Sequence, residues 1–272
     1  MCYPQNEGGT GFKRVEDICR VFAAKRWWRM RTGDNLWSQL MMAKYCQRGH
    51  VVARKVQGNH SFIWKELLRI KAESEPHILW KINEAQISFW WDNWTGIGPL
   101  ALYHHTDNNP GNLNVADIID GDKWDMEYIN NLLPPDICHI IQRVEIGSRN
   151  KKDQPIWTHN SSGEFTCASA YQSLRKKIPE IPIWKCIWKN GIPFKMAFII
   201  WRAIKKKLPM YDRIKKYARS ADPMCICCDH PEEETICHVL INGDMASKGW
   251  NYFGNYMGVS MQNQNIQARI LN

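Results

Sequence analysis

The feature that most constrains the fold of this chain is a cluster of cysteine and histidine residues near its C-terminal end. Cys225 and Cys228 are separated by two residues, a spacing that allows both thiolates of one tight turn to reach a single metal ion. His238 follows at a distance that a short loop can close. Cysteine thiolates and histidine nitrogens are the usual ligands of structural zinc, so we predict a small zinc-knuckle loop around these three residues.

A family resemblance extends outward from this cluster. Cys225-x-x-Cys228 is followed by Glu234-Thr235-x-x-His238 and then by Trp250. The pattern resembles the zinc-binding domain of plant reverse transcriptases from LINE-type (non-LTR) retrotransposons, in which this domain lies C-terminal to the polymerase. Other short motifs match the family in order and spacing over nearly the whole chain, and they include Gly8-Gly9-Thr10-Gly11-Phe12, Phe89-Trp-Trp-Asp92-Asn-Trp94, Gly163-Glu-Phe165-Thr166 and Trp201-Arg202-Ala203.

The chain departs from the family pattern at the expected fourth zinc ligand. The family has a cysteine five residues after the histidine, and Gly243 occupies that position here. Asp244 is our predicted replacement, and the alternatives are a water molecule, Cys227, Cys237 or His230. Three protein ligands with one open position are also typical of catalytic zinc, but decay of a transposon remnant explains a lost ligand more simply. The resemblance therefore implies zinc as the cofactor of a site that lacks its usual fourth ligand.

A strongly basic segment lies directly before the cluster. Residues 175–219 contain fourteen Lys and Arg against two acidic residues, a net charge of +12, so the rest of the chain carries −3 of the overall +9. Basic side chains interleaved with aromatic rings suit the phosphates and bases of a nucleic acid. The alternative is a solvated basic face whose aromatic residues belong to the core, namely Trp184, Trp188, Trp201, Tyr211 and Tyr217. The predicted nucleic-acid-binding residues are Lys205, Lys206, Lys207, Arg213, Lys215, Lys216 and Arg219.

Hydrophobic periodicity predicts an α+β fold that is mainly helical, with short β-hairpins and the zinc-knuckle loop. The apolar period changes to two in residues 78–82 and 87–91, which we expect to pair as a hairpin. Ala85 stands in its turn where the family usually has glycine, a residue that adopts positive φ easily. A second hairpin is expected between residues 156–158 and 164–166.

The predicted domain organisation has five parts. They are a helical segment with a hairpin at 1–95, a linker rich in Gly, Asn, Asp and Pro at 96–123, connecting helices at 124–152, the zinc-binding domain at 153–255 and a frayed tail at 256–272. The last helix before the cluster is expected to begin at Pro209 and to turn Tyr217 inward.

The sequence lacks the motifs of common catalytic centres. A polymerase holds two divalent metals with paired carboxylates, and neither Tyr-x-Asp-Asp nor Ala-Asp-Asp occurs. P-loop, Gly-x-Ser-x-Gly and His-Glu-x-x-His motifs are also absent. We therefore predict no catalytic residue and no enzyme. The family resemblance implies the non-catalytic, nucleic-acid-handling C-terminal fragment of a retrotransposon reverse transcriptase.

The expected partners are RNA or DNA without sequence specificity, and a polymerase supplied in trans. One alternative is a structural or protein-interaction remnant with a degenerate zinc site that does not bind nucleic acid. The acidic residues 232–234 are expected to buffer the charge of the knuckle, bind a basic partner or form a solvated loop. Another alternative is an enzyme whose open zinc position activates water. No stretch approaches the ~18 apolar residues of a membrane span, and the first thirty residues lack the apolar centre of a signal peptide. We expect an intracellular protein, nuclear or cytoplasmic, with no membrane partner.

Overall fold

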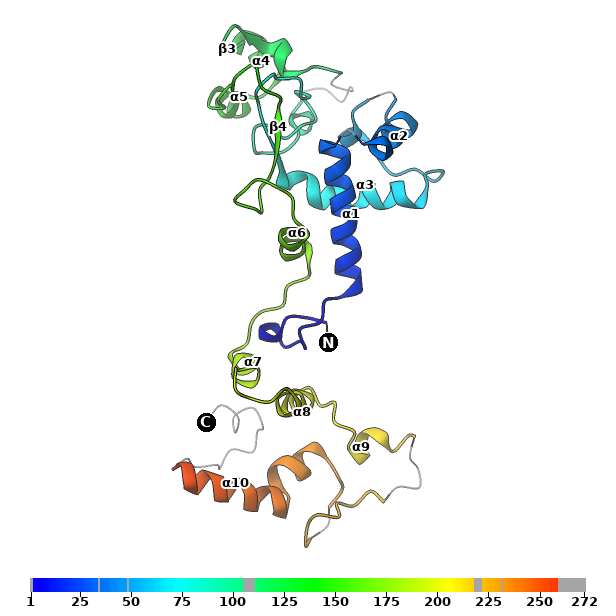
Figure 1. Ribbon diagram of the computed structural model, residues 1–272, viewed down its shortest axis with the longest axis vertical. Coiled ribbons are helices and arrows are strands. Elements are labelled where there is room, and N and C mark those ends of the chain that lie inside the picture. The colour runs from blue at the N-terminus through cyan, green and yellow to red at the C-terminus, as the bar shows by residue number, and fades with distance from the viewer. Residues whose placement is uncertain are drawn as a thin grey trace. The chain divides into compact units, whose positions relative to one another are not determined.

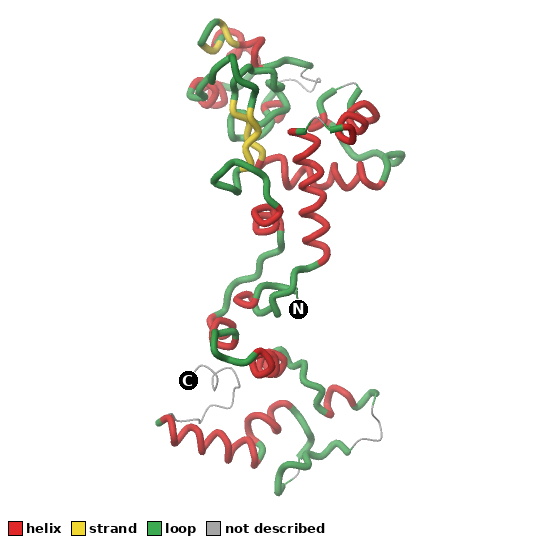
Figure 2. Tube along the Cα trace, viewed as in Figure 1, coloured by secondary structure: helices red, strands yellow, loops and turns green. Residues whose placement is uncertain are grey.

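The computed structural model describes residues 2–33, 35–47, 49–104, 111–217, 222–230 and 232–258. The chain forms two compact units, which we call the central unit (Val15–Lys176) and the terminal unit (Met1–Arg14 together with Lys177–Asn272). Helices predominate in the described residues, and the strands form two small antiparallel sheets (Figures 1 and 2). The predicted α+β, mainly helical class is therefore confirmed. Across the described part of the chain, no helix combines the length and the apolar character that crossing a bilayer requires.

The central unit is built around a long first helix. Its helices are α1 (Val15–Thr32), α2 (Leu36–Tyr45), α3 (Phe62–Ser74), α4 (Met126–Leu132), α5 (Pro135–Gln142) and α6 (Cys167–Leu174). Its strands are β1 (Ile78–Lys81), β2 (Ile119–Asp120), β3 (Lys123–Trp124) and β4 (Gln154–Trp157). Helix α1 packs against α3 and α6 (Figure 1), and the apolar side chains between them include Trp27, Trp64 and Trp157, all fully buried.

The strand pairing differs from the two predicted hairpins. Strand β1 pairs with β4 in antiparallel fashion, with Ile78 opposite Trp157 and Lys81 opposite Gln154. Residues 87–91 are not the partner of β1, and residues 164–166 are not the partner of β4, so both predictions were wrong about the pairing. The short β2–β3 hairpin was not predicted. Period-two alternation identifies a strand but contains no information about which distant strand completes its hydrogen bonds.

The side chain of Asp153 holds the turn that follows β1, and this turn directs residues 87–91 away from β1. Asp153 Oδ1 accepts hydrogen bonds from the backbone N–H groups of Asn83 (2.6 Å) and Ala85 (3.0 Å), and Oδ2 accepts from those of Gln86 (2.7 Å) and Ile87 (3.3 Å). Ala85 is fully buried at φ +62°, so the predicted positive-φ position is confirmed. Charge-assisted hydrogen bonds contribute about 1.5–3 kcal/mol each, which offsets the ~1–2 kcal/mol cost of a left-handed alanine.

A buried ion network lies where α1 meets the segment after α3. The Arg31 guanidinium binds Glu75 at 3.1 Å and also Asp92, and Trp27 Nε1 donates to Glu75 at 2.7 Å. Burial opposes the charge on Arg31, but the two carboxylates outweigh this effect and raise its pKa. His50 Nε2 lies 3.4 Å from Asp92. Burial and the nearby guanidinium lower the pKa of His50 to about 4 despite that carboxylate, so His50 is neutral at pH 7.

The terminal unit joins the two ends of the sequence. Its helices are α7 (Pro182–Ile187), α8 (Phe194–Ile204), α9 (Tyr211–Ile214) and α10 (Asp244–Met257), with short helical turns at Gln5–Glu7 and His238–Asn242. Helix α10 continues through residues for which the sequence predicted no clear element. Helix α9 ends earlier than expected, and Tyr217 is 80% exposed rather than turned inward.

The N-terminal glycine motif packs onto the tryptophans of α7 and α8. Trp201 Nε1 donates to the Gly8 carbonyl oxygen at 3.0 Å, and the backbone N–H of Ile178 donates to Glu7 Oε2 at 3.1 Å. Gly8 has φ +78°, and a Cβ there would lie 2.7 Å from the Trp184 ring. Only glycine fits this backbone conformation and this close approach. The motif and its contacts Ile178 and Trp201 are more than 170 residues apart in the sequence. The N-terminal residues thus complete the core of the unit that contains the cysteine and histidine cluster.

Candidate metal centre

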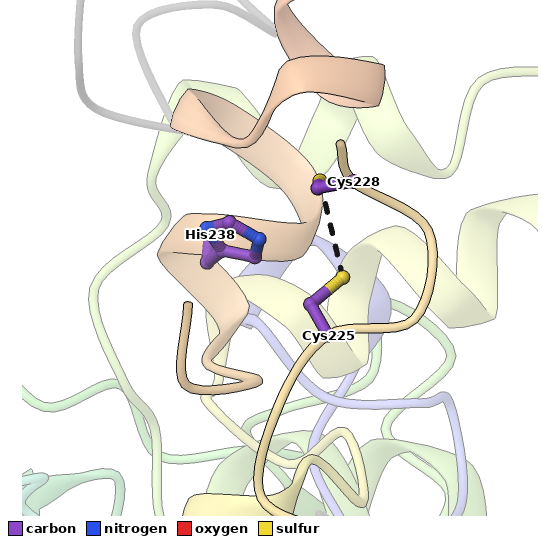
Figure 3. A group of neighbouring side chains, drawn as sticks. All are labelled: Cys225, Cys228 and His238. Atoms are coloured by element: carbon purple, nitrogen blue, oxygen red, sulfur yellow. Dashed lines mark hydrogen bonds between the residues drawn. The ribbon is translucent and has the colours of Figure 1, made fainter. Parts of the chain in front are cut away.

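The structure brings together the three residues that the sequence predicted as zinc ligands. One potential ligand atom from each of Cys225, Cys228 and His238 lies within 4.8 Å of the other two, and the cysteine Sγ atoms are 3.9 Å apart. In Figure 3 the two cysteines approach each other from one loop, and the histidine ring lies beside them on the following helical turn. Two thiolates and one imidazole are a donor set that suits tetrahedral zinc.

The backbone around the cluster explains how a loop holds this arrangement. Met224 and Glu233 form an isolated antiparallel bridge, and the Cys225 N–H donates to the Glu232 carbonyl oxygen at 2.8 Å. These bonds close the loop that contains both cysteines. The Thr235 hydroxyl then accepts from the His238 N–H at 3.1 Å and fixes the start of the helical turn at His238–Asn242. The turn has π-helical bonding, which occurs frequently at functional sites.

The two ring nitrogens of His238 have different environments. The residue is 4% exposed, its Nδ1 lies 3.2 Å from Glu232 Oε2, and its buried Nε2 has no hydrogen-bond partner within the described residues. A buried nitrogen without a partner is costly in a native protein. Histidines that bind a metal commonly donate their other N–H to a carboxylate, which fixes the tautomer and leaves the lone pair toward the metal. The environment of His238 therefore fits a metal bound at Nε2.

Sequence reasoning did not identify Glu232 as the partner of His238. The available signal was the run of three glutamates at 232–234, which was interpreted as buffering the knuckle, binding a basic partner or forming a solvated loop, without a contact to a particular residue. The Glu232 side chain is 70% exposed, so its contact with His238 lies at the edge of the cluster. A carboxylate six residues before the histidine reaches the ring only because the loop closes on itself, and this could not be inferred from spacing.

The predicted fourth ligand, Asp244, has other partners in the structure. Its carboxylate accepts from the backbone N–H of His230 at 3.1 Å and faces the His230 ring at 3.4 Å. The hydrogen bond from that backbone N–H, supported by the ring, lowers the pKa of Asp244. Asp244 lies outside the converging group, as do His230, Cys227 and Cys237, and both of these cysteines are exposed. Asp244 as a ligand remains a prediction.

Gly243, where the family has its cysteine, lies directly against His238. A Cβ built at this position would be 3.1 Å from His238 Nε2 and 2.6 Å from its carbonyl oxygen. The backbone has φ −66° and ψ 158°, which any L-residue adopts. A side chain at 243 would thus begin beside the nitrogen that has no partner.

The predicted nucleic-acid-binding residues lie on the same unit, in the segment that follows α8 and in and after α9. The six described ones are exposed and form no ion pair within the described part of the chain; they are Lys205, Lys206, Lys207, Arg213, Lys215 and Lys216. Arg219 lies outside the described residues. Of the interleaved aromatic residues, Trp184 and Trp201 are buried in the core, whereas Tyr217 is exposed. The alternative interpretation as core residues is correct for these two tryptophans.

The backbone at the end of α8 is unusual. The Lys207 N–H bonds the Arg202 carbonyl oxygen at 2.7 Å, and the Lys206 N–H bonds that of Ala203 at 2.9 Å. This pattern is a Schellman motif, whose left-handed position is usually glycine, and here Lys206 occupies it at φ +51°. Lysine is thus present where it costs backbone strain of order 1 kcal/mol.

Comparison with known proteins places this cluster in a family context. Residues 165–250 match the family described as zinc-binding in reverse transcriptase. A putative ribonuclease H protein of Arabidopsis thaliana is 24% identical over 260 residues, which cover 88% of this chain and 41% of that relative. The chain therefore spans about two fifths of the length of this relative. No solved structure matches the chain significantly. The family match confirms the resemblance to a reverse transcriptase zinc-binding domain, and it includes Cys225, Cys228, His238 and Gly243.

Proposed function

We propose that this chain is a zinc-stabilised, non-catalytic nucleic-acid-binding fragment related to a plant retrotransposon reverse transcriptase. The observation that supports it most directly is the buried Nε2 of His238, which has no hydrogen-bond partner among the described residues and lies beside two cysteine sulfurs within the matched segment. Cys225, Cys228 and His238 would hold the zinc ion. The ion would cross-link the loop and the helical turn. The free energy of zinc binding is about 10–16 kcal/mol in small four-ligand sites, and it is smaller with three protein ligands.

The lysines after α8 supply the nucleic-acid-binding surface. They have no carboxylate partner in the described chain, so no acidic group there neutralises their charge, and the ammonium groups of Lys205 and Lys216 lie over the rings of Trp184 and Tyr217. Strained residues concentrate at functional sites, and Lys206 in its left-handed conformation is such a residue. Three successive lysines at a helix C-terminus also stabilise the helix dipole, which is the competing structural explanation. Tyr217, at 80% exposed, is the aromatic residue placed to stack on a base beside them.

The test compares nucleic-acid binding by the full chain and by two matched double variants. Fluorescence anisotropy of a labelled RNA hairpin and of a DNA duplex is measured at several salt concentrations, with zinc or with a chelator. K206Q/K207Q removes two adjacent lysines from the proposed surface, and K151Q/K152Q removes two adjacent exposed lysines from the central unit. Losing two phosphate contacts should reduce the slope of log K against log salt by about 1.8 on duplex DNA.

The expected result is steeply salt-dependent binding that K206Q/K207Q and the chelator weaken and K151Q/K152Q leaves nearly unchanged. No binding at low salt, or equal losses in both variants, would show that the basic segment is only a solvated face. Hydrolytic activity that depends on His238 would contradict the non-catalytic part of the proposal and support a zinc-activated water.

A protein-interaction role has one observation in its favour. Helix α10 exposes aromatic and methionine side chains along its length, with Tyr252 at 69%, Phe253 at 58% and Tyr256 at 85% exposed. Such a surface suits association with a protein partner, for example a polymerase supplied in trans. Two results together would favour this alternative. The wild-type chain would not bind nucleic acid, and F253S would lose self-association or the binding of a protein partner.

A further inference from the structure

The central unit contains a pocket lined by cationic side chains. It has a volume of about 530 Å³ and is lined by Arg26 and Arg29 from α1, Asn35 from the loop that follows, and Trp37 from α2. Ligand pockets usually have volumes of about 300–1,000 Å³, so this pocket is large enough for one nucleotide. Nothing in the proposed function uses these residues.

Both arginines of the pocket are available to an anion. Arg26 and Arg29 are exposed, and neither has a carboxylate partner among the described residues. By contrast, Arg31 in the next turn is buried and binds Glu75 and Asp92. Arginine presents planar, paired N–H donors that match the oxygens of a phosphate. The two guanidinium groups, which bind no carboxylate in the described part of the chain, therefore provide a phosphate-binding pair.

The remaining lining supplies what a base and sugar require. Trp37 is partly exposed and lines the pocket, and Asn35 caps α2 through its side-chain oxygen (3.0 Å to the Ser38 N–H), which leaves its NH2 group as a donor. Phe22, 50% exposed, lies one turn before Arg26 on the same face of α1. Alternating aromatic and cationic side chains are the common surface of proteins that bind single strands without sequence preference.

We propose that this pocket binds one phosphate–base unit of a single-stranded nucleic acid, with Arg26 and Arg29 on the phosphate and Trp37 stacked on the base. The occupant is single-stranded because a base must be unpaired and unstacked to reach the indole. An acidic protein segment could bind the two guanidinium groups but would gain little from stacking on the Trp37 ring. The tryptophan therefore favours a nucleic acid over an acidic protein segment as the ligand. This site goes beyond the proposed function and does not depend on zinc.

The test uses the full zinc-loaded chain and a labelled octameric uridine RNA in anisotropy titrations at several salt concentrations. R26Q/R29Q should weaken binding at least tenfold and lower the salt slope by about 1.4, the value for two lost contacts on a single strand. R26K/R29K keeps the charge and should retain the slope while losing affinity, because lysine lacks the paired donors. W37L should weaken binding about 5- to 150-fold with an unchanged slope, and W37F should lose less.

The controls separate this site from general charge and from the lysines of the terminal unit. K151Q/K152Q should change affinity less than twofold, and the losses from R26Q/R29Q should persist when K206Q/K207Q is also present. Polyglutamate of equal charge should compete poorly. Equal effects of R26Q/R29Q and K151Q/K152Q, full competition by polyglutamate, or unchanged binding by a folded W37L variant would each overturn the proposal, whatever the outcome for the lysines after α8. Thermal melting of each variant reports whether it is folded.

Discussion

Replacing Gly243 with cysteine should strengthen zinc binding, because the structure places this position against the unpaired nitrogen of His238. The new Cβ would begin 3.1 Å from Nε2, and the backbone at 243 accepts any L-residue. A cysteine thiolate there can reach a zinc ion bound by Cys225, Cys228 and His238, since Zn–S and Zn–N bonds measure about 2.3 and 2.0–2.1 Å. Gly243→Cys would thus convert a three-residue site into a four-residue one.

The size of the effect follows from two opposing contributions. Structural zinc in small four-ligand sites is worth about 10–16 kcal/mol, or roughly 3 kcal/mol for each ligand. Against this, the new Cβ would lie 2.6 Å from the His238 carbonyl oxygen, and relieving such a contact costs about 1–3 kcal/mol. The expected net gain is about 1.5 kcal/mol, which corresponds to roughly tenfold tighter zinc binding.

Zinc affinity is measured by competition with a chelator of known affinity, using wild type, Gly243→Cys and Gly243→Ser. Serine carries the same Cβ with a poor zinc ligand, so it isolates the steric cost and should bind zinc no better than wild type. Spectra of the Co²⁺-substituted proteins should report three thiolate ligands in the cysteine variant and two in the others. Equal zinc affinity in the cysteine and serine variants, with unchanged Co²⁺ spectra, would refute the argument that position 243 faces the metal.

Two further predictions concern the stability of each unit. Gly8→Ala should destabilise the terminal unit by about 2–4 kcal/mol, because alanine is strained at φ +78° and its Cβ would lie 2.7 Å from the Trp184 ring; faster hydrogen exchange in α7 and α8, with α1 unchanged, would show it, and normal protection there would contradict it. The central unit should lose about 2 kcal/mol between pH 7 and pH 5, because the folded-state pKa of His50 is lowered to about 4, below its unfolded value of about 6.5. This contribution is fully present above pH 6.5 and is lost as the pH falls toward 4, since the unfolded chain binds the proton first. Urea unfolding at both pH values measures it, and a His50→Gln variant with the same pH dependence as wild type would exclude His50 as its source.

The elements that the sequence predicted well are those whose signal is local. Helices α1 and α3 lie within residues 1–95, which were predicted to be a helical segment with a hairpin. Periodicity did not show which apolar side chains of α8 are buried, since Phe194 and Met196 are exposed. A helix with many apolar residues is predicted as buried, but only the packing around it decides how many of them are covered.

The candidate metal centre divides in the same way. Cys225, Cys228 and His238 could be predicted because two residues in a tight turn and a third one short loop away must be neighbours in space. The contact between Glu232 and His238 could not, because it depends on how the loop closes. Asp244 was chosen for its position in sequence next to Gly243, yet the structure directs its carboxylate to His230. Adjacent residues in a chain point their side chains in different directions, so proximity in sequence is a weak guide to a shared ligand.

The sequence by itself determined the mainly helical character of the chain, the three converging candidate metal ligands and the concentration of positive charge before them. Tertiary structure alone decided that β1 pairs with β4, that Gly8 completes the core beside Trp201, and that Asp153 holds the turn at Ala85. Hydrophobic periodicity, the spacing of ligands and local charge depend only on residues that are close together in the sequence. They are therefore the same whatever tertiary structure the chain adopts. The pairing of strands and the buried polar contacts between distant segments exist only in the folded chain. Each of them depends on which hydrogen-bond partners the other segments have already found.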